Sequence, residues 1–211
     1  MKVGILGTGD VGKALGCGFI KLGHEVFMGS RDAQNPKALG WAKESGGKAG
    51  SFGQAAEFGE IVVLATLGTA TQDAIRLAGP EKFKGKLVFD TTNPLDFSRG
   101  MPPRLVGGLG DSAGEKVQTL LADAQVVKVF NTVGNSMMFR PQLKGGPPDM
   151  FICGNSEPAK KKTAKILVDF GWNAMDVGDI SASHYLEALC VVWVMSAVKA
   201  NSFNQAFKLL K

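Results

Sequence analysis

A glycine motif at residues 7–12 constrains this chain more than any other feature. It reads G-x-G-x-x-G, follows an apolar run of strand type and opens a segment of helical type. In that context Gly7 permits a tight turn, Gly9 lets the backbone approach a pyrophosphate, and Gly12 lets the helix pack close to the strand. The helix N-terminus also offers unpaired N–H groups and a partial positive charge to phosphates. The motif therefore predicts a dinucleotide site on a strand–turn–helix unit.

Strand-like and helical segments alternate along most of the chain. This alternation predicts an α/β fold: a Rossmann-type doubly wound, mostly parallel sheet with a C-terminal helical segment. We predict strands at residues 2–6, 25–28, 61–65, 86–89, 126–130, 150–153 and 174–177, and helices at 10–22, 36–44, 70–77, 113–122 and 158–170.

The 211 residues divide into one large unit and a helical end. We expect an NADP-binding Rossmann domain at residues 1–180. Residues 181–211 have a purely helical pattern and are expected to pack on that domain or on a dimer partner. Residues 93–111 are rich in proline and glycine and long for an ordinary connection, which is typical of a functional loop.

The end of the second predicted strand indicates which dinucleotide the site prefers. Sites for NAD place Asp or Glu there, about 20 residues after the glycines, to bond the ribose hydroxyls. Here the strand runs into Gly29, Ser30 and Arg31, so no carboxylate repels a 2′-phosphate. Ser30 can donate one hydrogen bond, and the guanidinium of Arg31 matches phosphate oxygens. We predict NADP; the alternative is that Arg31 pairs with Asp32 on the surface. Lys37 is either a second positive charge of this site or a solvated helix residue.

Composition narrows the function classes. The net charge of +5 is spread along the chain, which fits an anionic small ligand better than nucleic acid. The three cysteines form no C-x-x-C pair, and two histidines supply no transition-metal cluster. The N-terminus lacks the pattern of a signal peptide, and the longest apolar run, residues 188–198, is about half of a membrane helix. We expect a cytoplasmic protein without a metal, a nucleic-acid partner or a membrane insertion.

Several segments resemble the NADP oxidoreductases that depend on the deazaflavin coenzyme F420. They are also similar to the cytosolic NADPH-binding domains of six-transmembrane metalloreductases. The matching segments cover nearly the whole chain in order: ILGTGDVGKALG, GHEVFMGSRD, DTTNPL, VVKVFNTVGN, MFICGN and DVGDISASHYLEALCVVW. The glycine and GSR motifs are specific for NADP, whereas the others define a broad group of dinucleotide-binding enzymes.

The resemblance implies that NADP lies along the carboxyl ends of the strands. Its diphosphate would lie on the glycine motif, its 2′-phosphate on Ser30 and Arg31, and its nicotinamide would pass the loops after later strands. The implied cofactor-binding residues are Gly7, Thr8, Gly9, Asp10, Val11, Gly12, Ser30, Arg31, Ala65, Thr66, Leu67, Asn93, Pro94, Asn131, Thr132 and Val133.

Four of these residues have specific expected roles at the nicotinamide end. Leu67 and Val133 would form apolar walls for the rings, and Asn93 and Asn131 would orient the carboxamide or the acceptor. The alternative for each asparagine is a turn or cap role, since Asn before Pro is a common turn signal.

Two positions on the acceptor side depart from the family pattern. Deazaflavin reductases carry a histidine and a proline near residues 131–134, and this chain has neither. They often carry an arginine before the Tyr-Leu-Glu of the last helix, where this chain has His184. A deazaflavin or flavin co-substrate is thus implied at the level of the family.

No catalytic acid or base stands out, so the catalytic residues stay unassigned. His184 and Glu187 lie three apart on a predicted helix face, where a surface or interface pair is expected.

Direct hydride transfer needs stacking and alignment more than acid–base chemistry. We therefore predict an NADP(H)-dependent oxidoreductase that transfers hydride between NADPH and a deazaflavin, flavin or similar acceptor. The alternatives are an NADPH-binding sensor or electron-transfer module acting through a partner protein, and a reductase of a small imine or keto substrate. The apolar last helix also predicts a homodimer.

Overall fold

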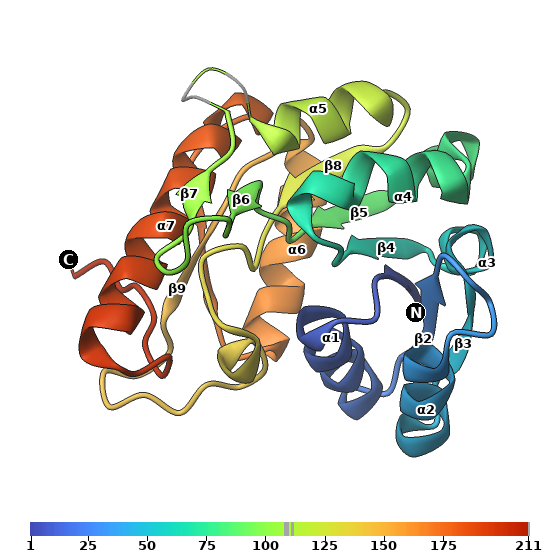
Figure 1. Ribbon diagram of the computed structural model, residues 1–211, viewed down its shortest axis with the longest axis horizontal. Coiled ribbons are helices and arrows are strands. Elements are labelled where there is room, and N and C mark those ends of the chain that lie inside the picture. Colours follow the sequence, from blue (N-terminus) through green and yellow to red (C-terminus); the bar gives the residue numbers. More distant parts are fainter. Residues whose placement is uncertain (108–109, 111, 211) are drawn as a thin grey trace.

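Six parallel strands form the central sheet in the computed structural model, which describes residues 1–107, 110 and 112–210 (Figure 1). They are β1 (Lys2–Leu6), β2 (Glu25–Ser30), β3 (Lys48–Ser51), β4 (Ile61–Leu64), β5 (Leu87–Asp90) and β8 (Gln125–Lys128). The strand order is β3-β2-β1-β4-β5-β8, so it reverses between β1 and β4. In such sheets ligands bind at the reversal point, outside the carboxyl ends of the strands. The predicted doubly wound, mostly parallel sheet is confirmed.

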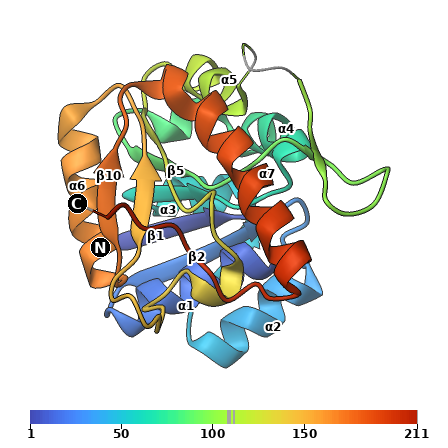
Figure 2. The ribbon, with the colours of Figure 1, turned by 90° about the vertical axis from the view of Figure 1, so that its left-hand side faces the viewer.

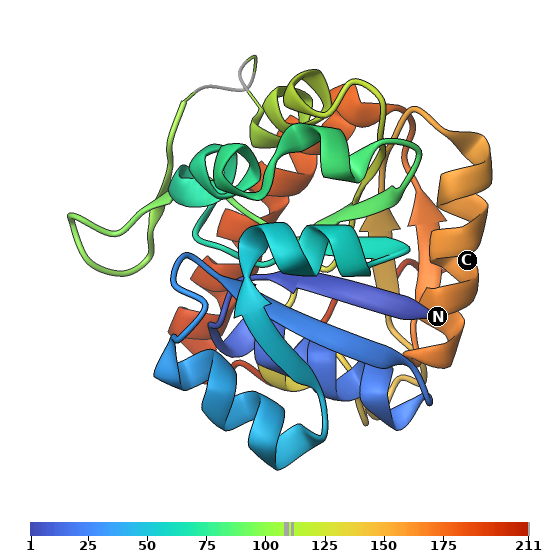
Figure 3. The same cartoon turned by 90° about the vertical axis from the view of Figure 1, so that its right-hand side faces the viewer.

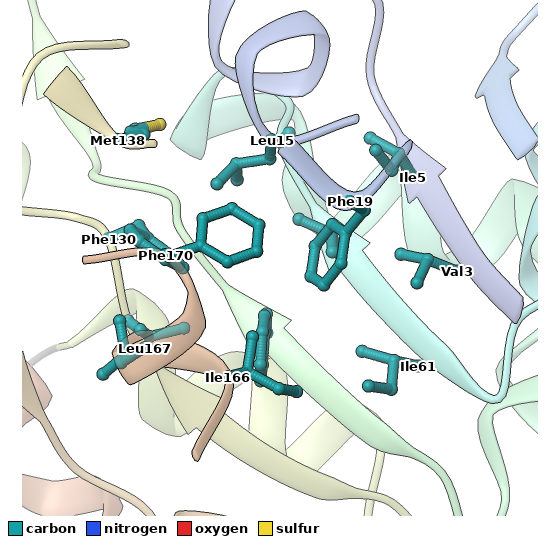
Figure 4. Packing of buried hydrophobic residues seen from close by; sticks show 14 of the residues in the cluster. Val3, Ile5, Leu15, Phe19, Ile61, Phe130, Met138, Ile166, Leu167 and Phe170 are labelled. Atoms are coloured by element: carbon teal, nitrogen blue, oxygen red, sulfur yellow. The ribbon is translucent and has the colours of Figure 1, made fainter. Parts of the chain in front are cut away.

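Helices cover both faces of this sheet because the strands are apolar on both sides. One face packs against α1 (Asp10–Lys21), α2 (Pro36–Ser45) and α6 (Glu157–Asp169). The other packs against α3 (Phe52–Phe58), α4 (Thr71–Ala78) and α5 (Ala113–Leu120). On the first face Phe19 of α1 meets Phe170 edge-on at a centroid distance of 4.8 Å, above the strand residues Val3, Ile5 and Ile61 (Figure 4).

The edge strand β3 and the helix α3 were not predicted. The strand is only Lys-Ala-Gly-Ser, and the helix spans seven residues, so neither is long enough to show a clear period. A local signal was nevertheless present: Ser51 and Gln54 form a capping box, in which each side chain bonds the other residue's backbone N–H. Helix α3 packs against β1 and β2, and Figure 3 shows it lying beside β1 on this face of the sheet.

The C-terminal segment is less helical than predicted. Helix α7 (Ser183–Ala200) ends where Asn201 adopts a left-handed conformation, with φ 47°. Residues 201–210 then run without regular structure back across the protein, where the Asp149 N–H donates to the Phe207 carbonyl at 3.0 Å. The last predicted helical residue, Lys211, lies outside the described residues.

Two smaller sheets complete the chain. The late strands β9 (Asp149–Ile152) and β10 (Asn173–Asp176) pair in parallel with each other and do not join the central sheet as strands. The long loop predicted at residues 93–111, whose end Asp111 lies outside the described residues, contains the short hairpin β6 (Leu95–Asp96) and β7 (Arg104–Leu105). The connection between these two strands, residues 97–103, projects from the body beside α4 and α7 (Figure 2).

One helical segment in the described part of the chain, Ile180–Ala200, is long and apolar enough to cross a membrane. An 18-residue window of it has a mean hydropathy of 1.3, and 44% of that window is buried inside the protein. The expectation that the apolar run is too short therefore does not hold for the whole segment. The side chains of Leu186, Cys190 and Trp193 face the protein core, as in a core helix of a globular domain.

Candidate functional site

Two glycines of the motif are required by the fold itself. Gly7 has φ 133°, and a Cβ there would lie 2.2 Å from the carbonyl oxygen of Ala65. A Cβ on Gly12 would lie 2.5 Å from the carbonyl oxygen of Gly7. These close approaches bring the turn after β1 against both the end of β4 and the start of α1. Either side chain would push backbone atoms apart.

Gly9 has no such structural requirement. Its φ and ψ of −78° and −179° suit any residue, and a Cβ there would meet no atom of the described residues within 4 Å. It is the N-cap of α1, and no side chain caps that helix end. The position is therefore open space beside the N–H groups of a helix N-terminus. A phosphate fits such a place, because the bare backbone can approach it closely.

The end of β2 carries a cation that is free to bind an anion. Ser30 is buried, and its hydroxyl donates to the Asp32 carbonyl oxygen. The Asp32 carboxylate accepts from the Gln34 N–H at 2.9 Å. Arg31 is exposed, and in the described part of the chain no carboxylate forms an ion pair with it. The alternative of an Arg31–Asp32 pair is thus not what the structure contains.

The predicted residues after β4 differ in exposure. Ala65 is buried and Thr66 is half-buried, with its hydroxyl 2.9 Å from that of Thr71. Leu67 is 74% exposed, a large apolar side chain at the carboxyl edge of the sheet. Val133, the other predicted wall, is 8% exposed and belongs to the core beneath α1. The surface offered to a ring at this edge is therefore that of Leu67.

The structure brings the two predicted asparagines together. Asn93 follows β5 and Asn131 follows β8, and their side chains meet across 38 residues of sequence. The Asn93 Nδ2 donates to the Asn131 carbonyl oxygen at 2.8 Å, and the Asn131 Nδ2 donates to the Asn93 Oδ1 at 2.9 Å. The Asn131 Nδ2 also donates to the Leu186 carbonyl oxygen of α7 at 2.9 Å. Asn131 is 2% exposed, and its Oδ1 has no hydrogen-bond partner among the described residues.

A buried ion cluster lies directly behind this pair, and the sequence analysis missed it. The Lys128 Nζ lies 2.8 Å from the Asp90 Oδ2 and 2.8 Å from the Glu187 Oε1, and it donates to the Thr92 carbonyl oxygen at 2.9 Å. All three charged side chains are at most 1% exposed. Burial alone would lower the pKa of Lys128, but the two carboxylates outweigh it, and the pKa is raised.

The remaining oxygens of the cluster are also satisfied. The Asp90 Oδ1 accepts from the N–H and the hydroxyl of Thr92, at 3.0 and 2.7 Å. Glu187 accepts from the N–H groups of Ala113 and Gly114, at the start of α5, at 3.1 and 3.0 Å. The expected surface pair of Glu187 with His184 is thus wrong, because Glu187 points inward to Lys128. The sequence did contain a signal for the cluster, because Asp90, Lys128 and Glu187 are charged residues that each lie in an otherwise apolar segment.

Two of the three cysteines are inert by burial. Burial raises the pKa of both Cys153 and Cys190 to about 12. Cys17 is half-buried beside an open groove of about 400 Å³ that follows α1 from Asp10 to Lys21. All three thiols are free. No group of three His, Cys, Asp or Glu side chains among the described residues is arranged to hold a metal.

Comparisons with known proteins show the family of this chain. The model of the family described as NADP oxidoreductase, coenzyme F420-dependent, matches residues 2–94, which include the glycine motif and Arg31. The crystal structure of a candidate F420-dependent NADP reductase from Arthrobacter sp. FB24 has 37% sequence identity and a TM-score of 0.93, and the match covers 100% of both chains.

Two curated proteins are more distant relatives. The F420-dependent NADP reductase of Methanothermobacter marburgensis is 27% identical over 99% of this chain and 98% of its own length. The metalloreductase STEAP3 of Rattus norvegicus is 26% identical over 89% of this chain but only 36% of its own length. This chain therefore spans about a third of that metalloreductase and nearly all of the archaeal reductase.

Proposed function

Because this chain belongs to the family of coenzyme F420-dependent NADP oxidoreductases, we propose that it transfers hydride between NADPH and a deazaflavin, flavin or similar ring acceptor. That it is an NADP-dependent oxidoreductase follows from the family. The observation that carries the cofactor site is the open position at Gly9 together with Arg31, which pairs with no carboxylate of the described residues. When bound, NADPH supplies the hydride from its nicotinamide ring.

The chain's own residues bind and align the reactants in this proposal. The first-turn N–H groups of α1 hold the diphosphate, and the Arg31 guanidinium holds the 2′-phosphate. Leu67 covers one side of the nicotinamide edge, and Asn93 and Asn131 line the carboxyl ends of β5 and β8. We also propose cofactor contacts for the other residues of the glycine motif and for Ser30, Ala65, Thr66, Pro94, Thr132 and Val133. Two stacked rings need no protein acid for a direct hydride transfer.

NADPH oxidation by the purified protein tests the proposal. The assay compares the deazaflavin coenzyme F420, FMN, FAD and no acceptor, with NADH as the control donor. We expect steady turnover with one ring acceptor and a preference for NADPH over NADH of ~100-fold in kcat/KM, the scale of one charge-assisted contact to a phosphate. Turnover with a small imine or keto substrate but with no ring acceptor would reject the proposal.

A second candidate is an NADPH-binding electron-transfer module that acts through a partner protein. It is favoured by the match to the metalloreductase, in which this chain corresponds to about a third of the length. Tight NADPH binding without turnover of any soluble acceptor would favour this candidate over the reductase.

We also propose that the protein is a homodimer. The outer face of α7 leaves Tyr185, Val192 and Met195 more than half exposed, and Phe97 is equally exposed on the projecting loop. Contiguous exposed apolar side chains of this kind mark interaction surfaces. Light scattering at micromolar concentration should give twice the chain mass of 22.2 kDa, and a mass near 22.2 kDa would reject the dimer.

Three free cysteines fit the reducing cytoplasm, where we place the protein.

A further inference from the structure

The buried Lys128–Asp90–Glu187 cluster is not needed to bind NADP in the proposal above, yet it lies directly behind the strand ends where the nicotinamide is placed. We infer that Lys128, held by Asp90 and Glu187, is a positioning residue that fixes the Asn93–Asn131 pair and thereby the nicotinamide end of the cofactor site. The inference rests on the proposed NADP site. It assigns a role in that site to residues that do not themselves touch the cofactor.

The cluster joins three separate elements at one point. Asp90 ends β5, Lys128 ends β8, and the two residues are register partners in the sheet. Glu187 lies one turn into α7. Each of the three charges is fully enclosed and hydrogen-bonded, so none can move without leaving another buried charge unpaired.

Hydrogen bonds connect this cluster to the asparagine pair on both sides. The Lys128 Nζ holds the carbonyl oxygen of Thr92, the residue directly before Asn93. Leu186, the residue directly before Glu187, provides the carbonyl oxygen that accepts from the Asn131 Nδ2. The loop after β5 and the start of α7 are therefore tied to the same ammonium group, with the Asn93–Asn131 pair between them.

Stability alone is a weak reason for such a cluster. Burying one lysine and two carboxylates has a large desolvation cost, and replacing a buried ion cluster by apolar residues is often neutral or stabilising. What an ion cluster provides is a single arrangement, because its bonds specify which atoms meet. Here the arrangement that it specifies is the relative position of two strand ends and α7.

Two ligands separate the nicotinamide end from the rest of the site. NADPH carries the 2′-phosphate, the diphosphate and the nicotinamide, whereas 2′-phospho-ADP-ribose has the 2′-phosphate and the diphosphate but no nicotinamide. The Kd for 2′-phospho-ADP-ribose divided by the Kd for NADPH, both measured by calorimetry, reports what the nicotinamide end contributes to binding. The emission of bound NADPH is a second readout, because it depends on how the nicotinamide ring is enclosed.

Three variants make the comparison. Lys128→Met removes the ammonium and leaves two buried carboxylates, so it can fail to fold. Glu187→Gln keeps the Lys128–Asp90 pair and is the milder change. Lys160→Met is the matched control, since Lys160 is also buried and paired with two carboxylates, Glu157 at 2.6 Å and Asp176 at 2.8 Å.

We expect Glu187→Gln, and Lys128→Met if it folds, to lower the Kd ratio by ~5-fold or more, the scale of one lost hydrogen-bonded contact. Their Kd for 2′-phospho-ADP-ribose should stay at the wild-type value, and Lys160→Met should leave the ratio unchanged. A folded Glu187→Gln protein with the wild-type ratio and NADPH emission would overturn the inference. A wild-type ratio near one would overturn it too, and wild-type protein that binds neither ligand would instead reject the proposed NADP site and the inference with it.

Discussion

Replacing Gly9 by alanine is expected to weaken NADPH binding by ~10–100-fold, the scale of one overpacked methyl group at a close contact. The fold should tolerate the change, because among the residues that the structure describes the new Cβ meets no atom within 4 Å, and the backbone angles suit alanine. We expect the free energy of unfolding to fall by less than ~1 kcal/mol, since alanine is a poorer N-cap than glycine. Calorimetry with NADPH and thermal denaturation of the same sample measure both effects.

Gly7→Ala is the matched control, because it adds the same methyl group two residues earlier. There the Cβ would lie 2.2 Å from the Ala65 carbonyl oxygen, and φ is 133°. We expect a loss of about 2–4 kcal/mol in the free energy of unfolding, from backbone strain and overpacking together. If Gly9→Ala instead destabilised the protein as much as Gly7→Ala, or bound NADPH as wild type does, the phosphate would not lie at Gly9.

The order of strands and helices could be predicted because buried parallel strands are continuous apolar runs. The run that became β4, Ile-Val-Val-Leu, is of this kind. The strand β3 could not be predicted in the same way, because an edge strand of Lys-Ala-Gly-Ser has little apolar surface of its own. Its place is fixed by pairing with β2, which is a tertiary contact.

The candidate site was predictable where the chemistry is local. The glycine turn, the helix N-terminus and Arg31 lie within one strand–helix–strand unit, so their spacing along the chain determines how they meet. The cluster of Lys128, Asp90 and Glu187 joins residues far apart in sequence. A lysine inside an apolar strand indicates a buried partner, but only the fold shows which carboxylates reach it.

The end of helix α7 could not be predicted for a different reason. Its sequence continues the helical composition of α7, yet the helix ends at Ala200 and the tail turns back. The Trp193 indole N–H donates to the Gln205 carbonyl oxygen at 3.1 Å, and Phe203 packs on the same indole at a centroid distance of 5.9 Å. These tertiary contacts outweigh the weak helical propensity of a short terminal segment.

Arg31→Ala is expected to raise the Kd for NADPH by ~30–100-fold, since a hydrogen-bonded ion pair with a phosphate is worth about 2–3 kcal/mol. The Kd for NADH should change little, because NADH has no 2′-phosphate for the guanidinium to hold. Arg31 is exposed, and within the described chain no carboxylate pairs with it, so its loss should not alter the free energy of unfolding.

Two further variants isolate the cause of that effect. Arg31→Lys keeps the positive charge but loses the planar fork, so we expect it to retain only part of the NADPH preference. Arg76→Ala removes another exposed arginine, which pairs with Asp73 at 2.8 Å on α4, and should leave both affinities unchanged. Equal losses for NADPH and NADH in Arg31→Ala would contradict the assignment, because a lost 2′-phosphate contact can weaken only the ligand that carries this phosphate. The ratio of the Kd for NADH to the Kd for NADPH would then be unchanged. That result would place the source of the NADP preference elsewhere on the loop after β2, with Lys37 as the next cation to test.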